Sequence, residues 1–315
     1  MPSRFNWCTV TTAPASNDRS PVAEPVPRHH KLPDDAAVPG ALPNCIVIGA
    51  MKCGTTSLNC YRHQHPDIFM ARPKELNFFL KERNWYRGVD WYRSHFSKRM
   101  PIRGETSPLY AALPVYEGVP ERMHAVVPEA SLIYLVRDPV ERLRSHYCHA
   151  RLHIGERRTF EDALEQNPLM FGVSSYHAQL THYLRHFPRE RILIVPSEDL
   201  KSNRLGTLRR IFTFLGVDPT FTSPRFRIVS HRTKFKRESR YHKHLYLYRA
   251  RQFLKRTLPF ELSGPMYWLL TLPITRPLRK PELSTVSLNI IRSRLQQEVD
   301  AFRLLTGMDF RHWTI

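Results

Sequence analysis

Short runs of apolar, mostly β-branched residues limit the possible folds of this chain more than any other feature. Each run has the length and composition of a strand that is buried on both faces. The three runs are CIVIG (45–49), LIYLV (132–136) and RILIV (191–195). Helical patterns lie between and after them, as in TTSLNCYRHQH (55–65) and LGTLRRIFTFLG (205–216). Because strands that alternate with helices build parallel sheets, we predict an α/β fold with a central parallel sheet flanked by helices.

Local signals mark the ends of several helices. Asp138, Pro139 and Glu141 follow the second run and predict an N-cap, a first helical residue and the third-position carboxylate of a capping box. Gly216 is expected to close the helix that precedes it, and Gly307 the last helix of the chain. The apolar face of that last helix is predicted to consist of Leu288, Ile291, Leu295, Val299, Phe302 and Leu305.

The composition divides the chain into two parts. Residues 1–42 are rich in Pro, Ala, Ser and charged residues and show neither a strand nor a helix period, so we predict a disordered tail. The alternating pattern belongs to residues 43–315. Since 42% of the 315 residues are apolar, this part can bury a core of its own, and we predict that it forms a single domain.

An excess of basic residues predicts anionic ligands. The chain holds 48 Lys and Arg against 28 Asp and Glu, a formal net charge of +20 with neutral histidines. Residues 232–280 combine basic and aromatic residues with an apolar stretch that prolines interrupt. Two interpretations stay open for this segment: a solvated helix followed by a packed excursion, or an amphipathic face that contacts an anionic membrane or a polyanion.

Features of secretion and membrane insertion are absent from the sequence. The five cysteines form no C-x-x-C pair, which disfavours a disulfide framework or a structural zinc site. No run of about 18 uninterrupted apolar residues is present, and the first thirty residues lack the apolar core of a signal peptide. We therefore expect a cytoplasmic protein, with peripheral contact to an anionic membrane through 232–280 as an option. The 16 histidines show no metal-ligand spacing, so we predict no metal.

The stretch IVIGAMKCGTTSL (46–58) places a glycine-bearing turn between the first strand and the first helix. Such a turn directs backbone N–H groups and the positive end of a helix dipole at one point, which suits a phosphate or a sulfate. Lys52 adds a full charge, and Gly54 permits a close approach of the backbone. Hydroxyls that can donate to an anion follow on Thr55, Thr56 and Ser57. The alternative is a tight turn with a hydroxyl N-cap and no ligand.

The order of residues in this turn disfavours a nucleotide kinase. A kinase-type loop reads G-x-x-x-x-G-K-[ST], with the lysine after the second glycine and a hydroxyl residue that holds magnesium. Here Lys52 precedes Gly54. We therefore expect an anion site that works without a metal ion.

Five stretches resemble, in the same order, motifs of the sulfotransferases that use 3′-phosphoadenosine 5′-phosphosulfate (PAPS), in particular the heparan sulfate and related carbohydrate enzymes. They are IVIGAMKCGTTSL, similar to the 5′-phosphosulfate loop; ARPKELNFFL, similar to the K-E-x-x-F-F element; GETSPLY, similar to the G-E-K-[ST]-P-x-Y segment; LIYLVRDPVERLRSHY, similar to the 3′-phosphate strand and helix; and LLTGMDFRHW, similar to the C-terminal ending. The resemblance spans residues 45–313 and implies a P-loop-like α/β fold with PAPS as the donor and no metal.

The resemblance also implies two catalytic residues. Lys52 matches the loop lysine that contacts the sulfate and the bridging oxygen, where a cation stabilises the charge that develops on the leaving phosphate. Glu75 matches the catalytic base, since an acceptor hydroxyl or amine must lose a proton as its bond to sulfur forms. The alternative for Glu75 is a surface carboxylate paired with Lys74 or Arg72.

Binding of the nucleotide is implied for two further groups of residues. The loop group is Lys52, Cys53, Gly54, Thr55, Thr56 and Ser57. Arg137 and Ser145 match the residues that hold the 3′-phosphate, and they lie near the crevice where α/β sheets bind ligands. A local ion pair between Arg137 and Asp138 is the alternative. Tyr176 and the segment VSHRTKFKR (229–237) correspond to regions that line the site and close over the nucleotide.

The acceptor side departs from the heparan 3-O-sulfotransferase pattern. Asn77 stands where a histidine is frequent in that group, and Thr106 where a lysine is frequent. A heparan acceptor is therefore not implied, and we expect a hydroxyl or amine of a sugar, lipid or small molecule, with no specific nucleic acid partner. The competing function is a basic module that binds a membrane or a polyanion through 232–280 without catalysis. That module has no use for Lys52, Glu75 and Arg137.

Overall fold

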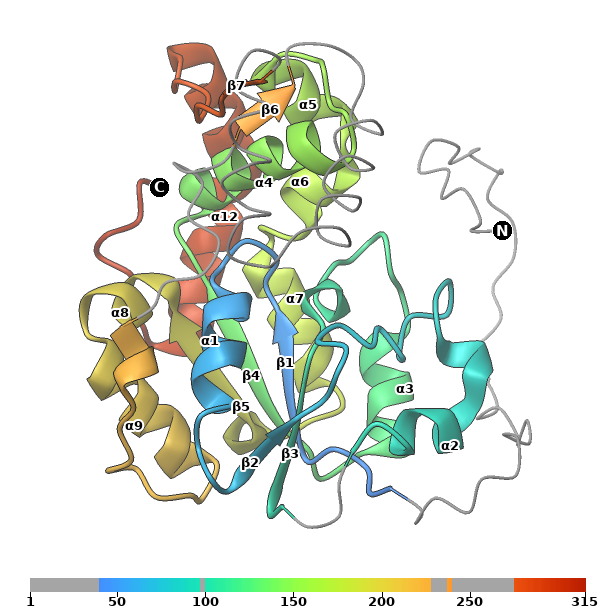
Figure 1. The fold of residues 1–315 in the computed structure, drawn as a ribbon. Coiled ribbons are helices and arrows are strands. Elements are labelled where there is room, and N and C mark those ends of the chain that lie inside the picture. The colour runs from blue at the N-terminus through green and yellow to red at the C-terminus, as the bar shows by residue number, and fades with distance from the viewer. Residues whose placement is uncertain (1–39, 97–99, 228–236, 240–274) are drawn as a thin grey trace.

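A five-stranded parallel sheet with the strand order β2-β3-β1-β4-β5 forms the centre of the molecule (Figure 1). The computed structural model describes residues 40–96, 100–227, 237–239 and 275–315. The strands are β1 (Cys45–Gly49), β2 (Ile68–Met70), β3 (Ile102–Thr106), β4 (Ser131–Val136) and β5 (Ile192–Pro196). Every neighbouring pair is parallel, as predicted from the alternation of strands and helices.

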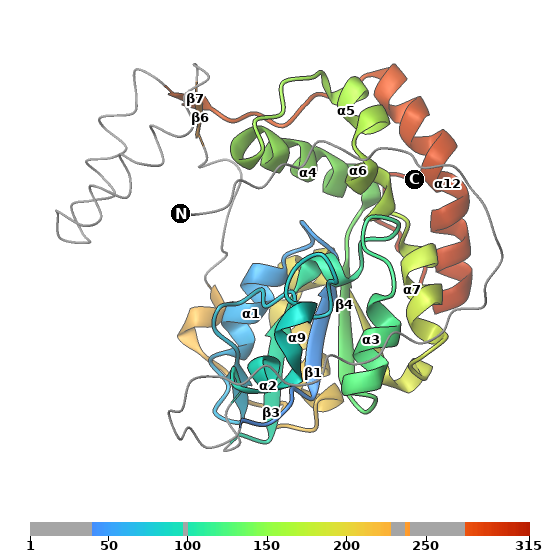
Figure 2. The same ribbon diagram turned by 90° about the vertical axis from the view of Figure 1, so that its right-hand side faces the viewer.

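Helices cover both faces of this sheet and lie beyond one end of its strands. They are α1 (Thr55–Arg62), α2 (Gly88–Arg93), α3 (Val119–Val126), α4 (Pro139–His153), α5 (Phe160–Gln166), α6 (Pro168–Gly172), α7 (Tyr176–Leu184), α8 (Ser197–Ser202), α9 (Arg204–Phe214) and α12 (Thr285–Thr306). Figure 2 shows α1 on one side of the sheet and α3 and α7 on the other, with α12 packed outside α7. In both views α4, α5 and α6 lie together beyond one end of the strands (Figures 1 and 2).

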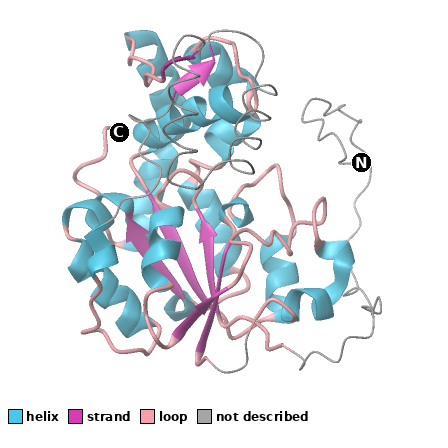
Figure 3. Ribbon diagram, in the orientation of Figure 1, coloured by secondary structure: helices cyan, strands magenta, loops and turns pink. Residues whose placement is uncertain are grey.

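The three predicted strands are present, and their fully buried residues form the core. Every residue of β1 is buried, as is β4 from Leu132 onward, because the helices on both faces exclude water from a near-continuous apolar run. The strand predicted at 191–195 is observed one residue later, at β5. Two further strands, β2 and β3, complete the sheet (Figure 3). A small antiparallel pair, β6 (Arg237–Ser239) with β7 (Thr275–Pro277), lies outside it.

The predicted N-cap of α4 is confirmed, but the predicted capping box is wrong. The Asp138 carboxylate accepts from the N–H of Val140 at 2.9 Å, directly after Pro139. A capping box requires the Glu141 carboxylate to accept from the N–H of Asp138. That N–H donates instead to Glu198 at 3.1 Å, because the Glu141 carboxylate is held by cationic side chains.

The predicted last helix is present as α12, and Gly307 ends it. Gly307 has a φ of 66° and donates its N–H to the Arg303 carbonyl at 2.9 Å. The buried face contains Ile291, Leu295, Val299 and Phe302, as predicted. Two members of the predicted face differ: Leu305 is exposed, and Leu288 is only partly buried.

Several predictions concern residues outside the described part of the chain. The predicted tail of residues 1–42 falls there almost completely, as does most of the basic segment 232–280. Among the described residues, no helix combines the length and the apolar character that crossing a membrane requires. The single domain, the cytoplasmic location and the peripheral membrane contact stay predictions.

Candidate active site

The predicted site residues gather where the strand order reverses. Strand β1 pairs with β3 on one side and with β4 on the other. The chain that leaves β1 goes on to β2, whereas the chain that leaves β4 goes on to β5 on the opposite side, so the two connections diverge at the carboxyl ends of β1 and β4. Ligands of open parallel sheets bind at such a point. The turn 50–54 follows β1, Arg137 follows β4, and Ser107 follows β3. The N–H of Ser107 donates to the Val47 carbonyl at 3.1 Å, so the segment after β3 begins directly beside β1.

The turn between β1 and α1 has an unusual backbone. Lys52 and Gly54 both have positive φ values, 75° and 94°, and only Gly54 is free of the associated steric cost. Hydrogen bonds hold the turn: Ala50 donates its N–H to Leu135 at 2.6 Å, and Cys53 donates its N–H to Ala50 at 3.2 Å. A conformation that costs energy at a lysine, held by the strand beside it, is typical of a ligand-binding turn.

The start of α1 presents donors for an anion. Gly54 is the N-cap and supplies no side-chain acceptor, and the first N–H groups of any helix lack an acceptor within the helix. Thr55, Thr56 and Ser57 are the first three residues of α1 and bring their hydroxyls to this end. The helix carries no acidic residue in its first turn, so its positive end is not neutralised from within. The turn and helix have the construction of the predicted phosphosulfate site.

Cys53 lies in this turn but offers its side chain to the core. The thiol is completely buried and lies 3.8 Å from the hydroxyl of Tyr176. Burial raises the pKa of the Cys53 thiol to about 11. Since its N–H is already bonded to Ala50, Cys53 contributes to the turn through its packing and not through a polar group directed at an anion.

Arg137 contacts the phosphosulfate turn directly. Its guanidinium donates to the Lys52 carbonyl at 3.4 Å and to the Glu141 carboxylate at 3.1 Å. The ion pair of Arg137 is thus with Glu141, whereas the alternative given for this arginine was a local pair with Asp138. Tyr176 donates its hydroxyl to the Arg137 carbonyl at 2.8 Å and so fixes the backbone at the end of β4. This hydrogen bond thus joins the end of β4 to the turn after β1, although Arg137 and Lys52 are 85 positions apart in sequence.

Ser145 is in the same helix as Glu141, one turn further on. It belongs to the buried side of α4 and is 7% exposed. Arg137 precedes the first residue of α4, and Ser145 lies near the middle of that helix, so the shared 3′-phosphate site of these two residues stays a prediction.

Sequence reasoning did not predict the cationic cluster around Glu141. Lys280 donates to its carboxylate at 2.5 Å and Arg144 at 2.5 Å, in addition to Arg137. Partial burial opposes ionisation of Glu141, but the contacts with Lys280 and Arg144 hold the pKa of its carboxyl below the ordinary value. Lys280 comes from the segment before α12, 139 positions away, so no local signal links it to Glu141.

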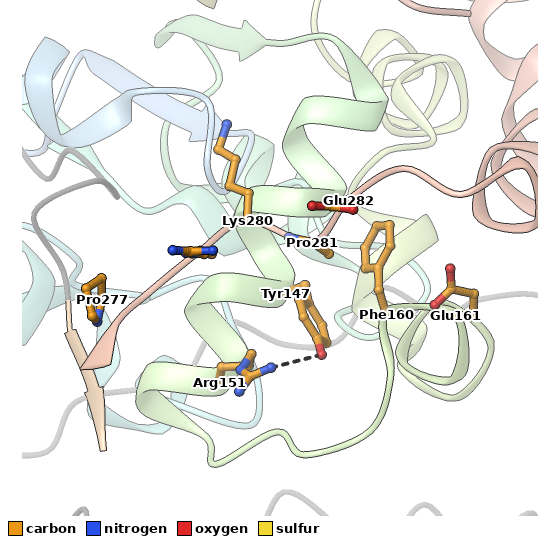
Figure 4. Close-up of a pocket in the computed structure, with 9 residues that line it drawn as sticks. Tyr147, Arg151, Phe160, Glu161, Pro277, Lys280, Pro281 and Glu282 are labelled. Carbon is orange, nitrogen blue, oxygen red and sulfur yellow. Dashed lines mark hydrogen bonds between the residues drawn. The ribbon is translucent and has the colours of Figure 1, made fainter. Parts of the chain in front are cut away.

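A pocket of about 590 Å³ lies on the far side of this cluster (Figure 4). Its walls include Tyr147 and Arg151 of α4, Phe160 of α5, and the segment that contains Lys280. In Figure 4 the Lys280 side chain extends away from Tyr147 and Phe160. Its ammonium group donates to the Glu141 carboxylate. None of the residues predicted for the site is among the residues that line this pocket, and Lys280, which does line it, is bonded to Glu141.

Glu75 lies in the segment that follows β2, at the same edge of the sheet. Its carboxylate is 45% exposed and accepts from Lys74 at 2.6 Å. The surface pair with Lys74 that sequence reasoning gave as the alternative is therefore present. An exposed pair of this kind contributes about 0 to 1 kcal/mol and leaves the carboxylate accessible to an acceptor.

Glu105, which was not predicted as a site residue, lies beneath the Glu75 segment. The residue is completely buried at the end of β3. Its signal in the sequence is a glutamate within GETSPLY, followed by Ser107 and Tyr110, whose hydroxyls both donate to it.

Among the described residues, no group of three or more His, Cys, Asp and Glu side chains is arranged to hold a metal ion.

Comparison with known proteins identifies the family. The family model described as the sulfotransferase domain matches residues 42–254. The chain belongs to the sulfotransferase domain family. This membership confirms the family that the sequence motifs predicted, and the five-stranded parallel sheet agrees with the predicted P-loop-like fold.

Individual relatives are similar over part of their length. The chain is 33% identical over 198 residues to human heparan sulfate glucosamine 3-O-sulfotransferase 3B1, and the match covers 59% of this chain and 49% of the relative. It is 29% identical over 199 residues to human bifunctional heparan sulfate N-deacetylase/N-sulfotransferase 2, covering 56% of this chain and 22% of the relative. The chain thus spans half or less of these relatives.

A solved structure agrees with the fold. The crystal structure of a sulfotransferase from Alicyclobacillus acidocaldarius has a TM-score of 0.54 and 26% identity, and the match covers 78% of this chain and 99% of that chain. The similarity thus extends over nearly the whole of a bacterial relative.

Proposed function

We propose that this sulfotransferase moves the sulfuryl group of PAPS to a hydroxyl or amine of a carbohydrate, with Lys52 and Glu75 in the two catalytic roles. The observation that carries the proposal is the hydrogen bond from Arg137 to the Lys52 carbonyl at 3.4 Å. It joins the turn suited to a phosphosulfate with the arginine suited to a 3′-phosphate. A nucleotide with anionic groups at both positions fits this pair better than a nucleoside triphosphate does.

The chemistry follows from the positions of these groups. The acceptor oxygen or nitrogen forms a bond to sulfur while the bond between sulfur and the bridging phosphate oxygen breaks. The acceptor proton passes to the Glu75 carboxylate, which is exposed at the same edge of the sheet. The charge that develops on the leaving phosphate is stabilised by Lys52 and by the N-terminus of α1, whose first turn carries no acidic residue.

A carbohydrate acceptor is favoured by the relatives and by the charge of the chain. Both human relatives are heparan sulfate enzymes by name. A net charge of +20 suits an anionic polymer. Asn77 and Thr106 differ from the 3-O-sulfotransferase pattern, so the amine of a glucosamine unit is proposed beside a sugar hydroxyl.

We predict that Lys52→Ala loses most of the thermal stabilisation by 3′-phosphoadenosine 5′-phosphate (PAP), the product nucleotide. A ligand that binds only the native state raises the midpoint of unfolding according to its affinity. The shift is measured with PAP and with ATP plus magnesium, and Lys201→Ala, which removes an exposed lysine of α8, serves as the control. A larger shift with ATP plus magnesium in the wild type contradicts the proposal and favours the kinase alternative.

We predict that Glu75→Gln keeps the PAP-dependent shift but loses at least about 100-fold in turnover, the usual contribution of a general base. Transfer from ³⁵S-labelled PAPS is measured with de-N-sulfated heparin, de-N-acetylated heparosan, a glycolipid and a simple phenol. Glu82→Gln changes an exposed glutamate seven positions away and should retain wild-type turnover. Full activity of Glu75→Gln on any acceptor would remove Glu75 from the mechanism.

A further inference from the structure

Glu105 is a buried carboxylate whose partners are hydroxyl groups. Its Oε1 accepts from Ser107 Oγ at 2.6 Å and from Tyr110 Oη at 2.8 Å, and its Oε2 accepts from Tyr92 Oη. The side chain has no exposed surface. Burial raises the pKa of the Glu105 carboxyl, while the hydroxyl bonds oppose that rise. A buried acid of this kind is costly and calls for a role.

Two of the three hydroxyls continue to the segment that carries Glu75. Ser107 Oγ accepts from the N–H of Asn77 at 3.1 Å, and Tyr110 Oη accepts from the N–H of Phe79 at 3.3 Å. Each hydroxyl thus accepts from the backbone and donates to the same carboxylate oxygen. A hydroxyl that donates to a carboxylate is polarised and becomes a stronger acceptor. Glu105 therefore strengthens both attachments of this segment at once.

The anchored segment has a demanding shape. Asn77 has a φ of 50°, a conformation that an asparagine adopts more readily than most residues. Its side-chain N–H₂ donates to the Glu75 carbonyl at 3.3 Å. This bond links the anchored backbone of Asn77 to the backbone of Glu75. The ring of Phe78, between the two anchored amides, stacks on Tyr92 at 4.3 Å.

We propose that Glu105 is a positioning residue that fixes Glu75 through the two hydroxyl bridges. The inference rests on the proposed role of Glu75 as base. Glu75 is exposed and outside regular structure, so its carboxylate needs an attachment to the sheet that acts close by. The bridges reach backbone two and four positions beyond it, and a misplacement of about 1 Å in an active site can cost about 100-fold in rate.

The test compares three substitutions that each remove one hydroxyl from the same carboxylate. Ser107→Ala and Tyr110→Phe break one bridge each, whereas Tyr92→Phe removes a donor to Glu105 that has no described bond to residues 75–79. Amide exchange of the peptide spanning 74–80 is measured by mass spectrometry on the full chain. Turnover is measured with ³⁵S-labelled PAPS and de-N-sulfated heparin, and nucleotide binding by the PAP-dependent thermal shift.

We expect faster exchange and a kcat lower by roughly 10- to 100-fold for Ser107→Ala and Tyr110→Phe, with the PAP-dependent shift unchanged. Tyr92→Phe should lose thermal stability yet keep wild-type exchange and kcat. Equal exchange in all three variants overturns the inference, as does an equal kcat for all three when Glu75→Gln is inactive. If Glu75→Gln is itself fully active, the proposed role of Glu75 fails instead, and faster exchange confined to the two bridge variants would leave the anchoring as a structural finding.

Discussion

At the scale of single residues, the chemistry of this site depends on charged groups whose surroundings differ sharply. Glu75 is exposed, whereas Glu105, beneath the same segment, is completely buried. Lys52 lies within the turn 50–54 and has a positive φ, and the Arg137 guanidinium donates to the carbonyl of that same lysine. The exposed carboxylate is suited to proton transfer, and the buried one to holding structure.

Glu105 should make the stability of the fold depend on pH. A carboxyl whose pKa is raised in the folded state binds more protons folded than unfolded, so stability falls as pH rises from the ordinary value of 4.5 toward the folded pKa. Urea unfolding of the wild type and Glu105→Gln, from about pH 5 to about pH 8, should show the wild type losing stability relative to the variant. A difference that stays constant with pH would contradict this expectation.

Single residues also show what the sequence could and could not predict. Lys52, Gly54 and Arg137 were predicted because their roles depend on a local turn or on the end of a strand, which sequence motifs describe. The direction of the Cys53 thiol and the position of Lys280 depend on packing against distant segments. A single sequence holds no record of those contacts.

At the scale of helices and strands, two strands of the sheet lack the apolar pattern by which the other three were predicted. β2 has three residues, and β3 reads IRGET, so neither shows the apolar run that reveals a buried strand. The charge in β3 is tolerated because Glu105 receives hydroxyl donors. The capping-box prediction failed because a residue distant in sequence, Lys280, donates to the Glu141 carboxylate.

The cap of α4 should matter more than an ordinary helix cap. Asp138 is buried, caps Val140, and accepts from the Thr314 hydroxyl at 2.5 Å. Loss of a cap costs about 1 kcal/mol, and the lost partner adds to that cost, so Asp138→Ala should destabilise by roughly 2 to 3 kcal/mol. Thr159→Ala, at the exposed cap of α5, is the matched control and should cost about 1 kcal/mol in urea unfolding. Equal losses would show that Thr314 adds nothing.

At the scale of the whole molecule, the C-terminal segment packs near the end of β4 that carries Arg137. Trp313 stacks on Phe310 at 4.2 Å and contacts the ring of Tyr176 at 5.6 Å. Tyr176 in turn donates to the Arg137 carbonyl. The C-terminal segment thus supports, through one tyrosine, the residue predicted to hold the 3′-phosphate.

Trp313→Ala should therefore affect both stability and nucleotide binding. Removal of a large buried aromatic side chain costs about 3 to 5 kcal/mol, and a displaced Tyr176 loosens Arg137, so the PAP-dependent thermal shift should shrink. Phe187→Ala removes another buried ring, near His124 and away from Arg137, and should lower stability while it preserves that shift. An undiminished shift in Trp313→Ala would disprove the link.

The hydrogen bond between Arg137 and the Lys52 carbonyl also bears on selectivity. It joins the two proposed anion sites before any ligand arrives, which limits the range of distances between them. Once one end of a bisphosphate nucleotide has bound, its other end meets the second site at a high effective concentration, which the rigid ribose sets. A nucleotide with only one matching phosphate lacks this gain and binds more weakly, as in avidity but within one small molecule. Neither site then needs a high affinity for its phosphate alone.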